Sequence, residues 1–479
     1  MLKEECGVFG ICSKPQSDVV LQTFYALYAL QHRGQESCGI AVNDDGVIEH
    51  FRDAGLVPEV FNQERLAQLG RGNMALGHVL YSSKQGLSRS NAQPLVVRHI
   101  KGPMALAFNG SLTNAYELRE ELEMNGAIFH SDSDIEVIGY VLTRARLRTP
   151  SIEKAVEAAM HELHGAYSLI VMSSTKMIAA RDPLGFRPLC MGKLDGDTVF
   201  ASETCALDSV GASFNREVEP GEIVLVNKSG THSIRTHCRG GSAFCALEFI
   251  YFSRPDSVIS GQSVHLARQE AGRFLAQESP ADADVVIGVP DSGLDAALGY
   301  SKESGIPYDV GFIKNRYIGR TFIQKQSQGV GSREQAVKIK LNTVDEAVRG
   351  KRVALIDDSI VRGTTFDRIV KLLREAGAKE VHIRIAAPPF LHPCFFGVEI
   401  ESRDNLIACR MSQDEIRRHF GADSIGYLSI EGLHNASKGA DCSLCDACFT
   451  GNYPIPVPAE KPVSKYVRKL SEKGGSNHA

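Results

Sequence analysis

The sequence lacks a strong charge of either sign and a long apolar run, and we expect no secretory leader. Its 479 residues carry a formal net charge of −4 and no prominent basic run, which argues against a nucleic-acid partner. No stretch approaches the roughly 18 apolar residues that a membrane span needs, and the beginning of the chain does not read as a signal peptide. We therefore expect no membrane association and a cytoplasmic location.

Cysteine, in contrast, is plentiful, with 12 residues. In a reducing compartment a disulfide framework is not expected, and a single cysteine is most often a small buried apolar residue. Cys442, Cys445 and Cys448 need another account, because they stand together in DCSLCDACFTG. A CxxC pair has the spacing of metal or cluster ligands.

The two halves of the chain differ in pattern, and the length suggests two or three domains. Residues 6–235 contain many short strand-like runs and a few helical patterns, which favours packed sheets covered by helices. These runs are CGVFGI, SCGIAV, NMALGHV, MALAFNGSL, AYSLIVM, KMIAARD, TVFASE and GEIVLVN. After a junction near 236–256, apolar runs alternate with longer helical patterns, which predicts a parallel sheet in an α/β domain.

The segment VALIDDSIVRGTTFDRIV carries the clearest chemistry of the second half. A buried strand ends in Asp357 and Asp358, and a loop rich in hydroxyls and glycine leads into a helix. Free N–H groups at a helix start suit a phosphate, and the carboxylates suit sugar hydroxyls or a nearby divalent ion. For the acidic pair alone, a polar turn between a strand and a helix is an equally good interpretation.

The full run of strand, DDS, RGTT and helix resembles the ribose-phosphate motif of type I phosphoribosyltransferases. The resemblance implies that Asp357 and Asp358 hold the ribose hydroxyls of phosphoribosyl pyrophosphate and that Mg²⁺ sits near them on the pyrophosphate. It implies that the loop binds the 5-phosphate through Ser359, Gly363, Thr364 and Thr365. The turn in VIGVPDSGLDAALGY is a candidate binding site for the pyrophosphate. KNRYIGRTFIQ resembles the start of the flexible loop that closes over this site. Its cationic residues, Lys314, Arg316 and Arg320, suit the charge of the leaving group.

The first half resembles the amino-terminal-nucleophile glutaminases. The matching runs, in order, are CGVFGI, LQHRGQESCGIAV, LGHVLY, FNGSLTN, HSDSDIEV, GAYSLIVM, RDPLGFRPL and ASETCA. Together with EFIYFSRPDS, KNRYIGRTFIQ, DDSIVRGTT and CFTGNYP, they resemble the glutamine phosphoribosylpyrophosphate amidotransferases from Cys6 to about Pro454. The implied fold is an αββα glutaminase sandwich over residues 6–235, followed by a type I phosphoribosyltransferase domain over 236–479.

Within this resemblance Cys6 is the nucleophile. A thiol with a pKa of about 8.5 needs a base, and an α-amino group that titrates near 8 can serve if the cysteine is residue one. Residues 1–5 are therefore expected to be a propeptide. By position, Asn109 and Gly110 supply oxyanion donors, Asp134 holds the glutamine α-amino group, and Arg33 links substrate recognition to the site.

The sequence departs from the family pattern at three places. Leu80 replaces the arginine that grips the α-carboxylate of glutamine, and neither Lys84 nor Arg89 matches that position. An unpaired desolvated carboxylate is costly, so we expect glutamine to bind weakly. The insertion KQSQGVGS lengthens the expected closing loop, and Gly293 stands where some members carry a serine near the metal.

The resemblance also assigns four cysteines to a [4Fe–4S] cluster, namely Cys245, Cys394, Cys445 and Cys448. Four thiolates fit such a cluster, and tetrahedral Zn²⁺ accepts the same set. Spacing does not separate the two, and Cys442 is an extra thiol that could exchange into the site.

The implied activity is the formation of 5-phosphoribosylamine, glutamate and pyrophosphate from phosphoribosyl pyrophosphate, glutamine and water, the first step of de novo purine synthesis. The family adds purine nucleotide inhibitors and homo-oligomers, often tetramers. Two alternatives stay open. One is an ammonia-dependent phosphoribosylamine synthase with an impaired glutaminase, which Leu80 favours. The other is a non-catalytic paralogue that senses phosphoribosyl pyrophosphate or nucleotides. The intact nucleophile argues against it, because such a protein would not need one.

Overall fold

The computed structural model describes residues 6–81, 89–315, 341–363, 366–398, 400 and 402–458. Within them the chain forms two compact units. The amino-terminal unit takes the described residues up to 244, those between 394 and 401, and those after 452. The carboxy-terminal unit takes 245–393 and 402–452. The expected propeptide lies outside the described residues, and the expected division at 235/236 stays a prediction.

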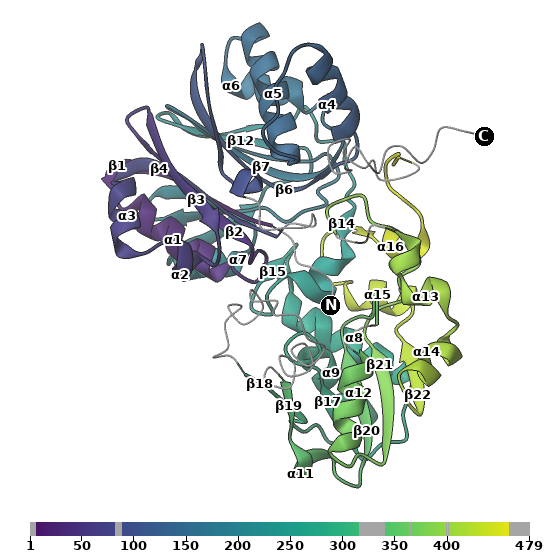
Figure 1. Cartoon of the computed structure of the whole chain (residues 1–479). Helices are drawn as coiled ribbons and strands as arrows, with labels where there is room; N and C mark the ends of the chain where they lie inside the picture. Colours follow the sequence, from purple (N-terminus) through teal and green to yellow (C-terminus); the bar gives the residue numbers. More distant parts are fainter. Residues whose placement is uncertain are drawn as a thin grey trace, which may run out of the picture. The chain divides into compact units, whose positions relative to one another are not determined.

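Two antiparallel sheets build the amino-terminal unit (Figure 1). The first has the strand order β11 (Ser213–Glu217), β9 (Cys190–Leu194), β10 (Asp197–Ala201), β1 (Gly7–Ser17), β4 (Gly72–Leu80), β2 (Ser37–Asp44) and β3 (Val47–Ala54). The second has the order β13 (Gly230–Ile234), β12 (Ile223–Asn227), β8 (Met177–Arg181), β7 (Gly165–Ser173), β6 (Gly102–Leu112) and β5 (Leu95–His99). Every strand-like run quoted above becomes one of these strands.

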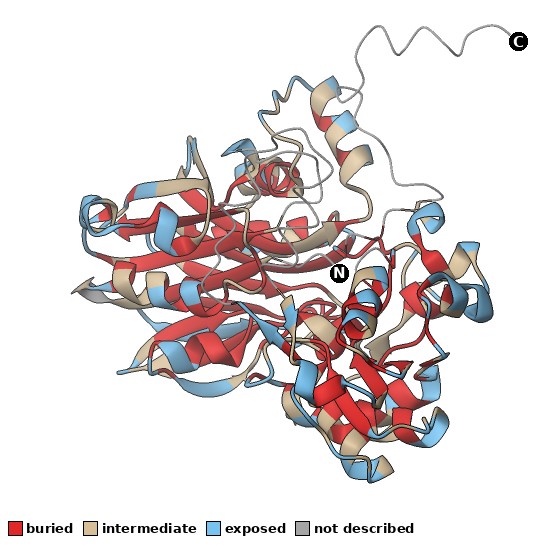
Figure 2. Cartoon of the chain, turned by 60° about the horizontal axis from the view of Figure 1, so that its bottom comes forward, coloured by how far each residue is buried: buried red, intermediate tan, exposed pale blue. Residues whose placement is uncertain are grey.

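The alternation of side chains along each strand sorts the core into three layers. In β1, Phe9 packs with the helices on one face of the first sheet, whereas Val8 packs between the sheets. In β6, Ala107 packs between the sheets and Phe108 packs against the helices on the outer face of the second sheet. Figure 2 shows long stretches of strand as buried, whereas β3, β5, β11 and β13, at the sheet edges, carry mostly intermediate and exposed residues.

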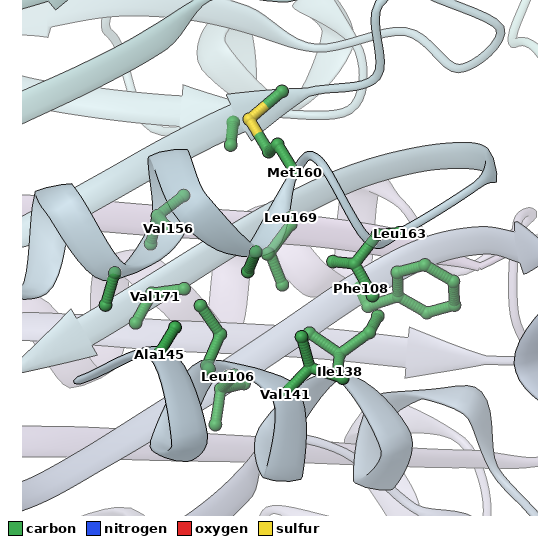
Figure 3. Close-up of a cluster of buried hydrophobic side chains, with 14 of the residues drawn as sticks. Leu106, Phe108, Ile138, Val141, Ala145, Val156, Met160, Leu163, Leu169 and Val171 are labelled. Atoms are coloured by element: carbon green, nitrogen blue, oxygen red, sulfur yellow. The ribbon is translucent and has the colours of Figure 1, made fainter. Parts of the chain in front are cut away.

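The helices cover the two outer faces. On the first sheet they are α1 (Val19–Ala29), α2 (Val57–Val60), α3 (Gln63–Leu69) and α7 (Thr204–Ser209), and on the second they are α4 (Ala115–Met124), α5 (Asp134–Arg148) and α6 (Ile152–Ala159). Figure 3 shows Ile138 and Val141 of α5 and Val156 of α6 packing over the strand residues Leu106 and Val171. The order helix, sheet, sheet, helix confirms the expected αββα sandwich.

The carboxy-terminal unit is built on a parallel sheet in the order β17 (Val285–Gly288), β20 (Arg352–Asp357), β21 (Glu380–Ile385) and β22 (Ser424–Tyr427). Its principal helices are α8 (Val264–Glu278), α9 (Leu294–Ser304), α12 (Phe366–Glu375), α14 (Gln413–His419) and α15 (Ile430–Ala436). The strand interiors are apolar and buried, as the sequence pattern predicts for a sheet covered on both faces.

None of the helices in the described part of the chain combines the length and the apolar character that a membrane crossing requires.

Candidate active sites

Cys6 directly precedes β1, a strand that is paired on one side with β10 and on the other with β4. Its side chain is half-buried, and its Sγ lies 3.9 Å from the carbonyl oxygen of Tyr81, the residue after β4. The next residue, Gly7, stands opposite Val79 of β4. Backbone pairing within the sheet therefore fixes where the candidate nucleophile lies.

A buried ion pair holds the backbone of Cys6. Arg33 Nε donates to the Cys6 carbonyl oxygen at 3.2 Å, and Arg33 Nη1 donates to Glu203 Oε1 at 2.5 Å. His32 Nε2 lies 2.6 Å from the same carboxylate oxygen. Arg33 and Glu203 are each 1% exposed, so removing either would leave the other charge buried and uncompensated. Sequence reasoning gave Arg33 a role but missed Glu203, whose only signal was its place in ASETCA.

The two expected oxyanion donors stand next to each other on β6. Asn109 is 1% exposed, and its Nδ2 has no hydrogen-bond partner among the described residues. Gly110 has φ of +143°, and a Cβ there would lie 1.9 Å from the Ala166 carbonyl oxygen on β7. Only glycine allows β6 and β7 to approach this closely.

The residue before this pair is anchored by two buried polar side chains. Phe108 N–H donates to Gln93 Oε1 at 2.8 Å, and His78 Nε2 lies 2.9 Å from the Phe108 carbonyl oxygen. Burial lowers the pKa of His78 to about 4, so the ring is neutral near pH 7 and donates from Nε2. His78 belongs to β4, in the sheet of the nucleophile, and the bond therefore ties β4 to β6.

The Asp182 carboxylate organises the other side of Gly110. Tyr167 stands opposite Gly110 in the β6–β7 register. Its N–H donates to Asp182 Oδ2 at 3.1 Å, and its carbonyl accepts from the Asp182 N–H at 2.9 Å. Residues in an antiparallel pair exchange both backbone bonds or neither. With Tyr167 bonded to Asp182, we infer that the Gly110 N–H points away from β7 and is available to a ligand.

Asp134 is the first residue of α5 and is bonded to the end of β6. Its Oδ2 accepts from the Leu112 N–H at 2.9 Å and from Ser111 Oγ at 3.4 Å. These bonds bring the expected ligand of the glutamine α-amino group to the strand that carries Asn109 and Gly110. Of the residues that the sequence named for glutamine chemistry, Cys6 thus directly precedes β1 and is bonded by Arg33, Asn109 and Gly110 lie on β6, and Asp134 is bonded to the end of β6.

In the carboxy-terminal unit, the acidic pair lies at the carboxyl end of β20, the edge where open α/β sheets bind ligands. Asp357 and Asp358 are each 7% exposed. Burial, together with the neighbouring Asp358 carboxylate, raises the pKa of Asp357. Ser292 Oγ donates to Asp358 Oδ1 and Ser359 Oγ donates to Asp358 Oδ2, both at 2.6 Å. Ser292, from the PDSG turn, is a polar neighbour that sequence reasoning did not single out.

Two other expected phosphate contacts lie near this edge. Lys314 ends β18 (Phe312–Lys314), and its Nζ donates to Asp291 Oδ2 in the PDSG turn at 2.5 Å. Gly363 has φ of +78° in the loop before α12, a conformation that suits glycine. Thr364, Thr365, Arg316, Arg320 and the KQSQGVGS insertion lie outside the described residues. A cavity of about 10 Å³ adjoins Ser292 and Asp358, lined mainly by apolar side chains of α8, α9 and α15.

Comparison with known proteins shows which families the two halves of the chain match. A glutamine amidotransferase domain model matches residues 82–209, and a phosphoribosyl transferase domain model matches residues 264–388. The amidophosphoribosyltransferase of Bacillus subtilis is 47% identical over 461 residues, covering 95% of both chains. That of Methanocaldococcus jannaschii is 46% identical over 95% of this chain and 99% of its own.

The chain belongs to the amidophosphoribosyltransferase family.

Two solved structures bear this out along nearly the full chain. One, named as the allosteric regulatory enzyme of purine biosynthesis, has a TM-score of 0.89 at 46% identity and covers 95% of this chain and 97% of its own. The other, a glutamine phosphoribosylpyrophosphate amidotransferase from B. subtilis complexed with ADP and GMP, has a TM-score of 0.88 at 46% identity, covering 95% and 99%. The resemblance stated from the motifs is confirmed.

The main departure from the amidophosphoribosyltransferase pattern, Leu80, lies at the end of β4 and is 8% exposed. Of the two residues considered as substitutes for the missing arginine, Arg89 is already engaged, because its guanidinium is bonded through Nε and Nη2 to both carboxylate oxygens of Asp53. Lys84 lies outside the described residues. The structure therefore places an apolar side chain beside Tyr81, whose carbonyl contacts the nucleophile.

Three of the four cysteines expected to bind a cluster belong to the carboxy-terminal unit. Cys245 ends β14 (Phe244–Cys245), which pairs with β23 (Leu444–Cys445). The Cys448 carbonyl accepts the N–H groups of Leu391 and His392, shortly before Cys394. Within the described residues, no three His, Cys, Asp or Glu side chains converge as a metal site. The backbone of the carboxy-terminal unit thus pairs the segment of Cys245 with that of Cys445 and bonds Cys448 to residues 391 and 392.

The environment of Asp182 predicts a pH effect on stability. Burial raises the pKa of Asp182 to about 6, against the opposing effect of the N–H groups that it accepts. A folded-state pKa above the unfolded value stabilises the fold at low pH, and this stability is lost as pH rises through 6. Relative to Asp182→Asn, the wild type should lose about 1 kcal/mol of unfolding free energy between pH 5 and pH 7.

Urea denaturation of both proteins at the two pH values measures this difference, with the exposed Asp208→Asn as a matched carboxyl control. Equal pH dependence in the wild type and Asp182→Asn would contradict the assignment.

Proposed function

We propose that this chain forms 5-phosphoribosylamine, glutamate and pyrophosphate from phosphoribosyl pyrophosphate, glutamine and water, as the entry step of purine synthesis. The observation that carries the proposal is the pairing of two sites in one chain. A thiol at a strand start lies in the unit that also holds buried amide donors on β6, and an acidic pair lies at the carboxyl edge of a parallel sheet. Relatives that are 46–47% identical along the whole chain support it.

In the glutaminase half, removal of residues 1–5 makes Cys6 residue one, and its α-amino group takes the thiol proton. The thiolate attacks the glutamine amide, and Asn109 Nδ2 and the Gly110 N–H stabilise the oxyanion. Ammonia leaves as a thioester forms, and water then releases glutamate. Asp134 binds the α-amino group of glutamine, and Arg33 fixes the Cys6 carbonyl.

In the phosphoribosyltransferase half, Asp357 and Asp358 hold the ribose hydroxyls, while Ser359, Gly363, Thr364 and Thr365 hold the 5-phosphate. Lys314 and Arg316 bind the pyrophosphate. Ammonia attacks C1, and the C1–O bond to pyrophosphate breaks. The carboxylates of Asp357 and Asp358 and the Ser292 hydroxyl are hard oxygen donors of the kind Mg²⁺ prefers, and a bound Mg²⁺ would neutralise pyrophosphate charge.

Because the two sites belong to different compact units, ammonia must pass between them without protonation by bulk water. The apolar lining of the small cavity behind Ser292 and Asp358 is consistent with a dry approach to C1. By analogy with the family, we also propose purine nucleotides as inhibitors, a homo-oligomer, often a tetramer in the family, and a cytoplasmic location.

For the cysteines we propose a [4Fe–4S] cluster held by Cys245, Cys394, Cys445 and Cys448, with Zn²⁺ as the alternative. Four thiols form the donor set of such a cluster, and the β14–β23 pairing and the contacts of Cys448 support the grouping. When bound, the group would supply a covalent cross-link between segments distant in sequence.

One specific observation favours a second candidate, an ammonia-dependent synthase with an impaired glutaminase. Leu80 offers no cation to the α-carboxylate of glutamine, and Arg89 is paired with Asp53. The presence of Cys6, Asn109, Gly110 and Asp134 opposes this candidate. It also opposes a purely sensory paralogue, for which a pyrophosphate-release assay is the direct test.

The function is tested by separating the two half-reactions. Cys6→Ser should lower glutamine-dependent phosphoribosylamine formation by about 10³-fold or more, because the nucleophile is lost, and should leave ammonia-dependent formation intact. Mass spectrometry of the wild type should find Cys6 as the first residue. A wild type that uses ammonia but not glutamine would favour the second candidate, and one that releases no pyrophosphate with either donor would contradict both enzymes.

Leu80→Arg tests the departure from the family. A guanidinium beside the α-carboxylate should lower KM for glutamine by about tenfold, since a hydrogen bond to a charged group contributes about 1.5–3 kcal/mol. Leu80→Met is the matched control of similar volume and should change KM little. A low-micromolar KM in the wild type would show that Leu80 does not weaken glutamine binding.

Metal analysis of anaerobically purified protein tests the cluster. We expect visible charge-transfer absorbance with about four iron and four sulfide per chain, retained in Cys442→Ser and lost in Cys445→Ser. Stoichiometric zinc without sulfide would refute the cluster and support the alternative.

A further inference from the structure

A short segment of the chain makes an excursion from the carboxy-terminal unit into the amino-terminal unit. Residues 245–393 and 402–452 belong to the carboxy-terminal unit, whereas the described residues between 394 and 401 belong to the amino-terminal unit. The excursion begins at Cys394, and its Phe395, Phe396 and Val398 side chains are buried. A surface connection would not bury three large apolar side chains, so the segment is docked.

The docking contacts come from the loop that follows β8. The Phe396 ring stacks on Phe186, with centroids 4.3 Å apart and planes at 24°. The Phe396 carbonyl accepts a hydrogen bond from Arg187 Nη2, and Arg187 is fully buried. The Phe186 N–H in turn donates to Asp182 Oδ2 at 3.1 Å. The carboxylate that binds Tyr167 therefore also fixes the loop that receives the segment.

Gly397 brings the segment to the oxyanion strand. It has φ of +113°, where side chains are disfavoured. A Cβ at this position would lie 2.7 Å from Arg187 Nη2 and 3.4 Å from the Gly110 carbonyl carbon. The Gly110 backbone is thus enclosed by the Ala166 backbone on β7 and by Gly397 of the excursion.

We propose that the docked excursion, through Gly397 and its anchors Phe396 and Arg187, positions Gly110 as an oxyanion donor. These are positioning residues, because none of them needs to touch glutamine. The chain on either side of the segment belongs to the phosphoribosyltransferase unit, whereas the segment itself belongs to the amino-terminal unit. Glutamine hydrolysis then depends on how this segment is docked. The inference rests on the proposed glutaminase chemistry. It adds that the docking of residues 394–401 controls the rate of glutamine hydrolysis.

Gly397→Ala tests the proposal, with Gly211→Ala as the matched control. Gly211 also has positive φ, +75°, in the amino-terminal unit, but a Cβ there meets nothing within 4 Å. The control therefore introduces a Cβ at a positive-φ glycine without the contact. Displacement of a donor should lower glutamine-dependent kcat by about 10- to 100-fold. KM for glutamine should stay within about twofold, and ammonia-dependent kcat should match the wild type.

Phe396→Leu provides an independent variant if Gly397→Ala fails to fold, as a loss of ammonia-dependent activity would reveal. It keeps the backbone and removes the ring stacking, and it should show the same split between donors. An unchanged glutamine-dependent kcat in Gly397→Ala would overturn the inference. If Gly397→Ala does not fold, an unchanged value in Phe396→Leu would do the same. Either result would leave the proposed function standing. An equal effect in Gly211→Ala would also overturn the inference and leave the proposed function standing. A wild type that cannot hydrolyse glutamine would overturn both.

Discussion

The Asp182 carboxylate accepts the backbone N–H groups of Tyr167 and Phe186. The first bond holds the N–H of the residue that stands opposite Gly110, and the second holds the loop on which Phe396 stacks. Arg181 reinforces that loop by donating to the carbonyls of Gly185 and Arg187. Because all these groups are buried, a lost bond would leave an unsatisfied polar atom, which costs about 1–3 kcal/mol.

The buried charged groups near Cys6 are likewise paired with hydrogen-bonding partners. Glu203 faces both Arg33 and His32, and His32 Nδ1 lies 3.1 Å from the Ala29 carbonyl oxygen. Both ring nitrogens of His32 thus lie within hydrogen-bond distance of oxygen atoms. Glu203 in turn holds the Arg33 guanidinium at the backbone carbonyl of Cys6.

The features that depend on the local sequence pattern could be predicted from the sequence. Strands with alternating or continuous apolar residues, such as β1 and β6, were predicted, whereas polar strands such as β3 (VIEHFRDA) and β13 (GTHSI) were not. The acidic pair at the end of β20 could be read because strand, turn and helix are contiguous. Glu203, Asp182 and Ser292 could not, because each acts on residues brought near only by folding: Glu203 binds Arg33 across 170 positions. Asp, Glu and Ser are common in loops. The neighbouring sequence does not distinguish a buried residue with several hydrogen-bond partners from an ordinary turn residue.

The excursion between Pro393 and Ser402 also bears on the order of events during synthesis. The ribosome has synthesised the strands of both sheets by residue 234. Gly397, which lies beside Gly110, is synthesised only later. The nascent amino-terminal unit can therefore fold well before its oxyanion strand is enclosed. Under the proposed function, the nucleophile would then become competent only after the second unit has been translated, and it would not hydrolyse glutamine while no acceptor site exists for the ammonia. The same connectivity means that a gene fragment ending near residue 244 would encode both sheets without the complete site.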